Sequence, residues 1–304
     1  MMQAKESPAR ETLGSRGSLD SHLAASIVAH HGVTVTVPAT GQYIRFDDKG
    51  RKGSGPLWAF NDGAHAAHGD WRTGESHVIQ PEGNTDTAKA EEARRRADEA
   101  KHQYEQARRK KQAQVAAQCR AEWPALPLAE PSHPYLVAKQ VQPHTLRQQG
   151  GALVVPLSDG ERMVNFQTIQ PDGAKRFRRG ARLTGCYHPM GTISPDKPLL
   201  ICEGWATGAS LHEATGFPVA CAMNAGNLLP VCESFRRRYR DQKIVIAADN
   251  DHVTEAQGKG NAGLTKGREA ARFIGAGLIW PDFKEGDTGT DYNDRLRPGG
   301  SIEV

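Results

Sequence analysis

The sequence contains few cysteines, and none of them has the spacing of a metal-binding or redox motif. Five are present, an odd number, and no two of them form a CxxC pair: Cys119, Cys186, Cys202, Cys221 and Cys232. Cys202 and Cys221 lie within apolar runs, where a thiol behaves as a small hydrophobic side chain. The pattern gives no indication of a disulfide framework or a cysteine zinc site, and it predicts reduced core thiols in a cytoplasmic protein.

Long apolar runs are also absent. No stretch approaches the roughly 18 residues needed to cross a bilayer, so no membrane segment is expected. The N-terminal residues lack the apolar core of a secretory signal. A GxxxxGK[ST] phosphate-binding loop is missing, which excludes a fused ATP-driven helicase of that type. The net charge of +4 is too small to indicate nucleic-acid binding by itself.

Changes in composition along the chain predict five segments. Short β-prone runs such as VTVTV at 33–37 indicate a small β-rich module, and apolar runs with SDG and PDG turns indicate a later β-meander. The expected segments are a disordered tail at 1–20, the β-rich module at 21–80, a charged helical linker at 81–123, a segment containing the meander at 124–192, and an α/β domain at 193–304.

The stretch at 85–121 consists mostly of strong helix formers and contains neither Gly nor Pro. It has too few apolar residues for a buried face or a sustained heptad seam. A long solvated helix that acts as a spacer is therefore expected. The basic run at 108–111 leaves open a contact with nucleic acid as the alternative.

The last third of the chain alternates apolar strands with helices. The expected strands are PLLIC at 198–202, PVACAM at 218–223, KIVIAA at 243–248 and GLIWPDF at 277–283. Continuous apolar strands separated by helices predict a mainly parallel sheet with helices on both faces. In such sheets ligands bind beyond the carboxyl ends of the strands.

Carboxylates stand at two of these strand ends. Glu203 directly follows the first strand, and Asp249 and Asp251 follow the third. Alternation along an extended chain places both aspartates on the same side. Three carboxylates at one sheet edge repel one another unless a cation lies among them, and oxygen ligands without His or Cys favour Mg²⁺ or Mn²⁺. A DxD sequence alone is more often a turn or a helix cap, but its combination with the strand–Glu–Gly–helix pattern predicts a metal site.

A second acidic group follows the fourth strand and includes Asp291 and Asp294. Either residue has the position of an N-cap for a short helix. A supporting role in the metal shell is the other interpretation, and the sequence leaves both open.

A basic tract precedes the α/β domain and holds five cations among eight residues. Its basic members are Lys175, Arg176, Arg178, Arg179 and Arg182. Such a tract is typical of a site for nucleic-acid backbone or nucleoside triphosphate, although a solvated basic hairpin is the simpler interpretation. Lys266, which lies where a Gly-rich loop opens a helix, is a further candidate for phosphate binding, or else a surface lysine.

The segments LLICEGWATGASLHEATG, AMNAGNL, IVIAADND, GNAGLTK and DYND together resemble a Toprim domain, in the subtype found in plasmid and phage DNA primases. The resemblance covers about 195–298, and the preceding meander also resembles these primases. It implies that Glu203, Asp249 and Asp251 hold divalent metal and are catalytic, with Asp291 and Asp294 as the last acidic motif. It further implies synthesis of short RNA primers on a single-stranded DNA template from ribonucleoside triphosphates by two-metal nucleotidyl transfer. Action at a replication fork would require a separate helicase.

The module at 41–74 also resembles the N-terminal region of some of these primases, but the chain lacks the Cys/His zinc ribbon of replicative primases. His65, His68 and His77 without cysteines are a poor zinc set, so no zinc is expected. Two alternatives remain open. One is a Toprim-type metal-dependent nuclease, and the other is a non-catalytic protein that binds single-stranded DNA.

Overall fold

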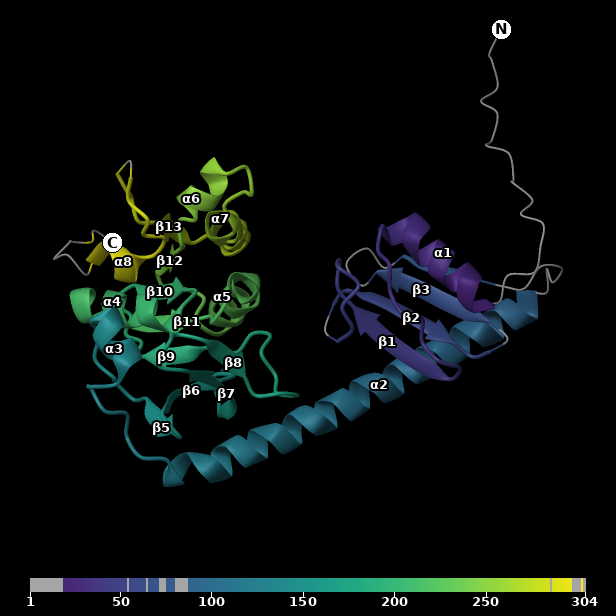
Figure 1. Cartoon of the computed structure of the whole chain (residues 1–304), viewed down its shortest axis with the longest axis horizontal. Helices are drawn as coiled ribbons and strands as arrows, with labels where there is room; N and C mark the ends of the chain where they lie inside the picture. Colours follow the sequence, from purple (N-terminus) through teal and green to yellow (C-terminus); the bar gives the residue numbers. More distant parts are fainter. Residues whose placement is uncertain are drawn as a thin grey trace, which may run out of the picture. The chain divides into compact units, whose positions relative to one another are not determined.

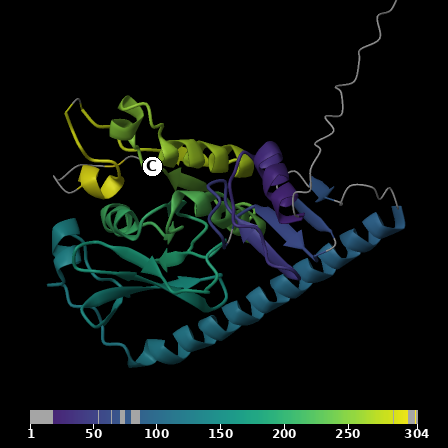
Figure 2. The same cartoon turned by 45° about the vertical axis from the view of Figure 1, so that its right-hand side comes forward.

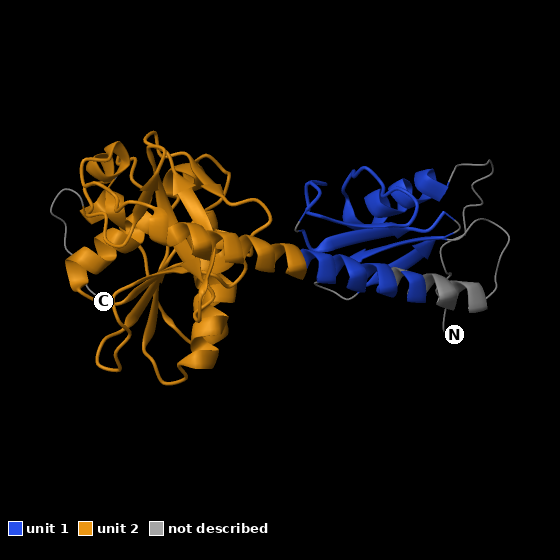
Figure 3. Cartoon of the chain, turned by 90° about the horizontal axis from the view of Figure 1, so that it is seen from below, with its two compact units in different colours: residues 1–108 blue, residues 109–304 orange. Residues whose placement is uncertain are grey.

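The computed structural model divides the chain into two compact units, residues 1–108 and 109–304, which are described separately (Figure 3). The residues that the structure describes are 19–53, 55–63, 65–70, 75–79, 87–284, 286–296 and 302. The predicted disordered tail therefore lies outside the described residues up to position 18. None of the helices in the described ranges is long and apolar enough to cross a membrane.

The first unit is built on a four-stranded antiparallel sheet with one helix packed against it (Figure 1). Its elements are α1 (Leu19–His31), β1 (Gln42–Phe46), β2 (Leu57–Asn61), β3 (Ala66–Asp70) and β4 (Ser76–Ile79). Leu23 and Ile27 of α1 are fully buried, in a core with Phe46 and Leu57 of the sheet. The helix was not expected from the sequence.

One predicted strand of this unit is wrong. The VTVTV run at 33–37 forms no strand, although Val33 and Val35 are buried while Thr34 and Thr36 are exposed. The alternation is therefore real, because it follows an extended chain that lies against a core. Among the described residues, however, no neighbouring strand forms backbone hydrogen bonds with this segment. Alternating burial alone therefore does not make it part of the sheet.

Four histidine rings gather where α1 meets β3 and β4. His31 Nε2 lies 2.9 Å from His68 Nδ1, and the rings of His30 and His77 are tilted by 33° with their centroids 3.8 Å apart. Burial, followed by the neighbouring imidazoles, lowers the pKa of His68 to about 3, so this ring is neutral at pH 7. His65 lies apart from the group, next to Asp62.

The helix α2 (Thr87–Glu122) runs from one unit into the other. In the first unit, the Tyr104 hydroxyl donates a hydrogen bond of 3.1 Å to the Gly53 carbonyl. In the second unit, the last turns bury Val115 and Cys119 against strands of the meander (Figures 1 and 2). The helix is thus not a purely solvated spacer, because Ala100 and Tyr104 near its middle pack in the first unit and its last turns are buried in the second.

The second unit begins with an antiparallel meander. After η1 (Trp123–Ala125) and α3 (Pro134–Lys139), the strands pair in the order β5 (Arg147–Gln149), β6 (Ala152–Ser158), β7 (Met163–Ile169) and β8 (Lys175–Phe177). The turns predicted at SDG and PDG contain Gly160 and Gly173, whose φ angles of 96° and 86° favour glycine. The meander leads directly into the second sheet of the unit.

This second sheet has five strands in the order β13-β12-β10-β11-β9. The strands are β9 (His188–Met190), β10 (Leu199–Cys202), β11 (Val219–Cys221), β12 (Ile244–Ala247) and β13 (Gly277–Ile279), and all pair in parallel except β9. The predicted last strand is shorter than expected, since Trp280 and Pro281 lie beyond β13. The predicted fold class, a mainly parallel sheet preceded by a meander, is confirmed.

Helices cover both faces of the parallel sheet (Figures 1 and 2). They are α4 (Trp205–Thr215), α5 (Leu228–Arg238), α7 (Ala262–Ile274) and α8 (Tyr292–Leu296), with the short α6 (His252–Ala256) after β12. Leu200 and Cys202 of β10 face the core that contains α4 and α8, while Leu199 and Ile201 face the core that contains α5 and α7. Burial on both faces explains why the strand sequences are continuously apolar.

Candidate metal and nucleotide site

Two of the predicted site carboxylates come together because their strands are neighbours. Strands β10 and β12 pair in parallel, with Cys202 opposite Ala247. Glu203 therefore leaves β10 at the same sheet edge where Asp249 follows β12, two residues past Ala247. The register alone places both side chains at the carboxyl edge, where ligands of open α/β sheets bind.

Asp251 is held by the Gly-rich loop that precedes α7. Its Oδ2 accepts a hydrogen bond of 3.0 Å from the Gly263 backbone N–H, and its own N–H donates to Asn261 Oδ1 at 3.1 Å. A side chain at Gly263 would place its Cβ 2.6 Å from the Asp249 carbonyl oxygen. Glycine is thus required there for α7 to approach the acidic loop so closely.

Burial and mutual repulsion act on these carboxylates. Burial raises the pKa of Glu203, and the charges of Asp251 and Asp291 raise it further, against a lowering hydrogen bond from the Ala225 backbone. Burial also raises the pKa of Asp249, well above its ordinary value, with added contributions from Glu203, Asp291 and Asp251. Four carboxylates therefore interact electrostatically at this edge of the sheet. We call this group the acidic edge; it consists of Glu203, Asp249, Asp251 and Asp291.

The second acidic group divides into two different environments. Asp291 Oδ1 accepts a hydrogen bond of 2.9 Å from the Asp294 N–H in the first turn of α8, and its Oδ2 accepts one of 3.1 Å from Thr207 of α4. Asp294 Oδ1 lies 3.5 Å from Lys139 Nζ, and its Oδ2 accepts from the Thr290 N–H. Asp291 is therefore both a helix cap and a neighbour of the acidic edge, whereas Asp294 faces a lysine of α3.

The basic tract is also split by its geometry. Lys175 acts electrostatically on both Glu203 and Asp249 and lowers the pKa of each. Arg176 and Arg178 line a separate small cavity, where the Arg178 guanidinium is paired with both oxygens of Glu122. Of the predicted basic residues, Lys175 is thus the one that the structure relates to the acidic edge.

The remaining predicted cations lie elsewhere. Arg179 is exposed, and Arg182 Nη1 lies 3.7 Å from Asp159 Oδ2. Lys266 is on α7, with its Nζ 2.6 Å from Glu269 Oε2. None of these contacts involves a phosphate, so phosphate binding by Arg179, Arg182 and Lys266 stays a prediction.

Several residues at the acidic edge were not identified from the sequence. The Met223 N–H donates to the Glu203 carbonyl at 2.7 Å, and Met223 has φ 72°, an uncommon conformation for a residue other than glycine. Asn227 supports this loop by donating to the carbonyls of Cys186 and Ala222, both at 2.8 Å. Both residues lie in the AMNAGNL segment, which contributes to the resemblance to a Toprim domain, but their individual roles depend on a turn between distant strands.

Tyr135 is a further residue that the sequence did not indicate. It is buried on α3, and its hydroxyl has no hydrogen-bond partner among the described residues. Burial raises the pKa of Tyr135, and the charge of Asp291 raises it further. The Lys175 ammonium lies 6.0 Å from its ring centroid. The meander and α3 therefore contribute side chains that lie close to Asp291.

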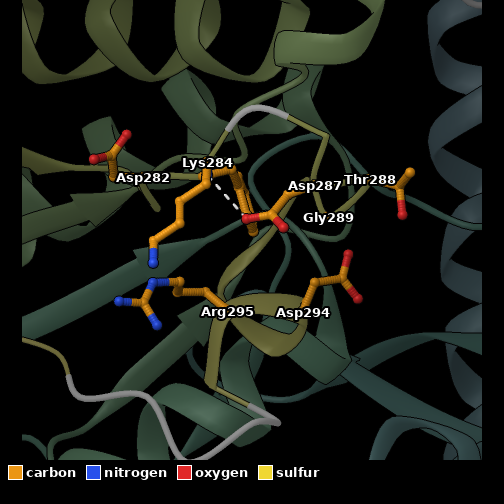
Figure 4. Close-up of a pocket in the computed structure, with 8 residues that line it drawn as sticks. Asp282, Lys284, Asp287, Thr288, Gly289, Asp294 and Arg295 are labelled. Atoms are coloured by element: carbon orange, nitrogen blue, oxygen red, sulfur yellow. Dashed lines mark hydrogen bonds between the residues drawn. The ribbon is translucent and has the colours of Figure 1, made fainter.

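A cavity of about 830 Å³ lies between the segment after β13 and α8, and no residue of the acidic edge is part of its lining. Figure 4 shows Lys284 and Arg295 reaching toward the same side of it, while Asp294 points the other way. The Lys284 N–H donates to Asp287 Oδ2 at 2.9 Å, which shapes the loop.

The chemistry of the acidic edge fits a divalent cation. Asp249 Oδ1 is buried and has no hydrogen-bond partner among the described residues, an arrangement that is costly for an ionised carboxylate. As they are placed, no three His, Cys, Asp or Glu side chains in the described ranges are close enough to hold an ion together. A cation would therefore have to draw these oxygens inward, and it would offset their repulsion and supply the missing partner of Asp249.

The stability of the metal-free protein is expected to depend on these groups. Both Asp249 and Glu203 have raised folded-state pKa values, so the folded chain holds protons that the unfolded chain releases. Their contribution is complete below the ordinary values of 3.8 and 4.5 and is lost as pH rises through the folded-state values. In chelator, the melting temperature of Asp249→Asn should therefore exceed that of wild type by an amount that grows with pH. A difference independent of pH would contradict the burial of an ionisable Asp249.

Comparison with known proteins finds a domain family that is similar to this part of the chain. A family model described as the Toprim domain matches residues 198–301. Two curated proteins from Escherichia coli, both called DNA primase TraC, are 35% and 34% identical over 180 and 166 residues, which cover 57% and 52% of this chain. The chain spans 17% and 11% of the lengths of these two relatives.

A solved structure also shows a weak likeness. It is a chain from a complex of the bacteriophage T7 lagging-strand DNA polymerase with primase domains bound to an RNA/DNA hybrid and dTTP. The match covers 51% of this chain and 81% of that chain, with 16% sequence identity and a TM-score of 0.37. A likeness at this level does not establish a common fold.

Proposed function

We propose, on the premise that residues 198–301 are a Toprim domain, that this chain is a DNA primase that synthesises short RNA primers on single-stranded DNA. Its substrates would be the template and ribonucleoside triphosphates, and its setting would be the replication of a plasmid, a phage or a conjugative element. The similarity to two curated proteins called DNA primase supports this reaction over others that share the domain.

The observation that carries the proposal is the acidic edge itself. Glu203, Asp249 and Asp251 are the proposed catalytic residues and metal ligands, with Asp291 beside them. Mg²⁺ or Mn²⁺ bound there would supply positive charge for activating a primer hydroxyl and for stabilising a departing pyrophosphate. The unpartnered Asp249 Oδ1 and the raised pKa values of Glu203 and Asp249 support this assignment, since both are relieved by a bound cation.

The remaining side chains of the site would position the substrate. Lys175 reaches the acidic edge from β8 and is suited to bind a phosphate oxygen of an incoming triphosphate. The Gly263 N–H keeps Asp251 oriented from the start of α7. Thr207 does the same for Asp291 from α4. These contacts fix the carboxylates before substrate arrives, which limits the reorganisation needed during the reaction.

A product assay tests the proposal. Wild type and Asp249→Ala are incubated with single-stranded DNA, labelled ribonucleotides and Mg²⁺, and the products are separated by length. We expect short labelled RNA from wild type alone. Degradation of the template by wild type, without RNA synthesis, would replace the primase with a Toprim nuclease that uses the same metal site. Tight DNA binding by both proteins without any chemistry would leave a non-catalytic single-strand-binding protein.

A further inference from the structure

A second charged site lies in the second unit, away from the acidic edge. A pocket of about 290 Å³ opens between the C-terminal half of α2 and the turn that joins β6 to β7. Four arginines line it together with a single carboxylate: Arg109, Arg120, Arg162, Arg182 and Asp159. We call this group the arginine pocket. It shares no residue with the acidic edge.

The spacing along α2 explains why arginines flank this pocket. Ala113 and Ala116 lie on the same side of the helix as Arg109 and Arg120, since positions separated by three or four residues share a face. Ala116 is buried in the same core as Val164 of β7. The small alanines allow the helix to approach the meander closely, and the arginines remain at either end of the contact.

Most of the positive charge in the arginine pocket is not neutralised. Arg182 Nη1 lies 3.7 Å from Asp159 Oδ2, and Arg120 donates to the Met163 carbonyl at 2.9 Å. Arg109 and Arg162 are exposed and form no ion pair with any residue in the described ranges. One carboxylate faces four guanidinium groups, which leaves three positive charges in excess.

The turn itself is rigid, so the charges are held in place. Asp159 Oδ1 accepts hydrogen bonds of 3.1 Å from the backbone N–H groups of Glu161 and Arg162. On its other side, Arg238 of α5 donates to the Gly160 carbonyl at 3.0 Å. Asp159 is therefore occupied in shaping the turn, and a fifth arginine adds to the positive field around it.

We propose that the arginine pocket binds backbone phosphates of single-stranded nucleic acid. Guanidinium groups present paired donors that match phosphate oxygens, and several of them around one opening favour a polyanion. The described lining contains no aromatic side chain on which a base would stack, so the contact is to the backbone and independent of sequence. The inference adds a template contact to the proposed function, but it requires neither metal nor nucleotidyl transfer.

Binding of a fluorescein-labelled oligothymidylate, followed by anisotropy in chelator over a range of salt concentrations, tests this inference. The variant is Arg109→Ala/Arg162→Ala, because both side chains are exposed and their loss leaves the fold intact. We expect an affinity about tenfold lower at low salt and a salt dependence whose slope falls by about 1.4, or roughly 0.7 for each phosphate contact.

The matched control is Lys243→Ala/Arg272→Ala, which removes two exposed positive charges outside the pocket. This control should lose little affinity and keep the slope of wild type. Equal losses in the two double variants would overturn the inference, because charge alone would then account for binding. A pocket variant that loses binding of labelled GTP but keeps oligothymidylate would also overturn it, in favour of a free nucleotide as ligand. None of these binding measurements depends on primer synthesis. A failure of the proposed function in the product assay can therefore be distinguished from a failure of this inference.

Discussion

Asp249→Asn is expected to lower primer synthesis by about 10³-fold while making the metal-free protein more stable. The carboxylate oxygen would be lost as a metal ligand, and metal-derived charge stabilisation is worth several kcal/mol, at about 1.4 kcal/mol for each factor of ten in rate. The same change removes a buried charge that three neighbouring carboxylates repel. Opposite effects on activity and stability are typical of residues that are strained for function.

Asp241→Asn provides the matched control for this prediction. Asp241 is exposed and precedes β12, whereas Asp249 follows it, so the two aspartates lie at opposite ends of one strand. The control should retain the activity and the melting temperature of wild type. Primer synthesis that survives in Asp249→Asn would show that chemistry occurs elsewhere, and a lower melting temperature would show that Asp249 is structurally stabilising.

Trp205→Ala is expected to cost about 3–5 kcal/mol in the free energy of unfolding. Trp205 begins α4, two residues after Glu203, and its side chain is fully buried in the core beneath the acidic edge. Its removal leaves a cavity that the surrounding strands fill only in part. Denaturant unfolding measured by circular dichroism gives the free energy directly.

Trp280→Ala serves as the matched tryptophan control. Trp280 is 43% exposed, just beyond β13, and the Arg268 guanidinium lies 5.8 Å from its ring centroid. Its loss should cost clearly less than the loss of Trp205, about 1–2 kcal/mol, since 43% of the residue is already exposed and the cation–π contact lies at the surface. Similar costs for the two variants would contradict the assignment of Trp205 to the main core.

The parallel sheet and its acidic edge were predictable because both follow from the same pattern of continuously apolar strands. A strand such as Ile244–Ala247 is apolar at every position, which requires burial on both faces, and the residues that follow such strands meet at one edge. The positions of Glu203 and Asp249 follow from this with no further information. The helix α1 was missed because its sequence carries several Ser and His residues and only a short apolar face, with Leu23 and Ile27.

The basic tract shows where sequence reasoning reaches its limit. Its composition indicated phosphate binding, but not which cation would reach which site. Strand β8 alternates its side chains, so neighbouring residues point to opposite faces. Lys175 consequently acts on the acidic edge while Arg176 lines a different cavity. The arginine pocket was harder to predict. The basic run at 108–111 and Arg182 were candidates for nucleic-acid contact, but Arg109 and Arg162 are more than fifty residues apart and meet only through the packing of α2 on the meander.

Titration of Mn²⁺ into the metal-free protein, followed by the electron paramagnetic resonance signal of the free ion, tests the central claim most directly. Wild type and Asp241→Asn should bind the ion with the same affinity. Glu203→Gln and Asp249→Asn should each bind it at least about tenfold more weakly, since each loses a charged oxygen ligand. Equal affinity in all four proteins, or no binding by wild type, would contradict a divalent metal site at the acidic edge.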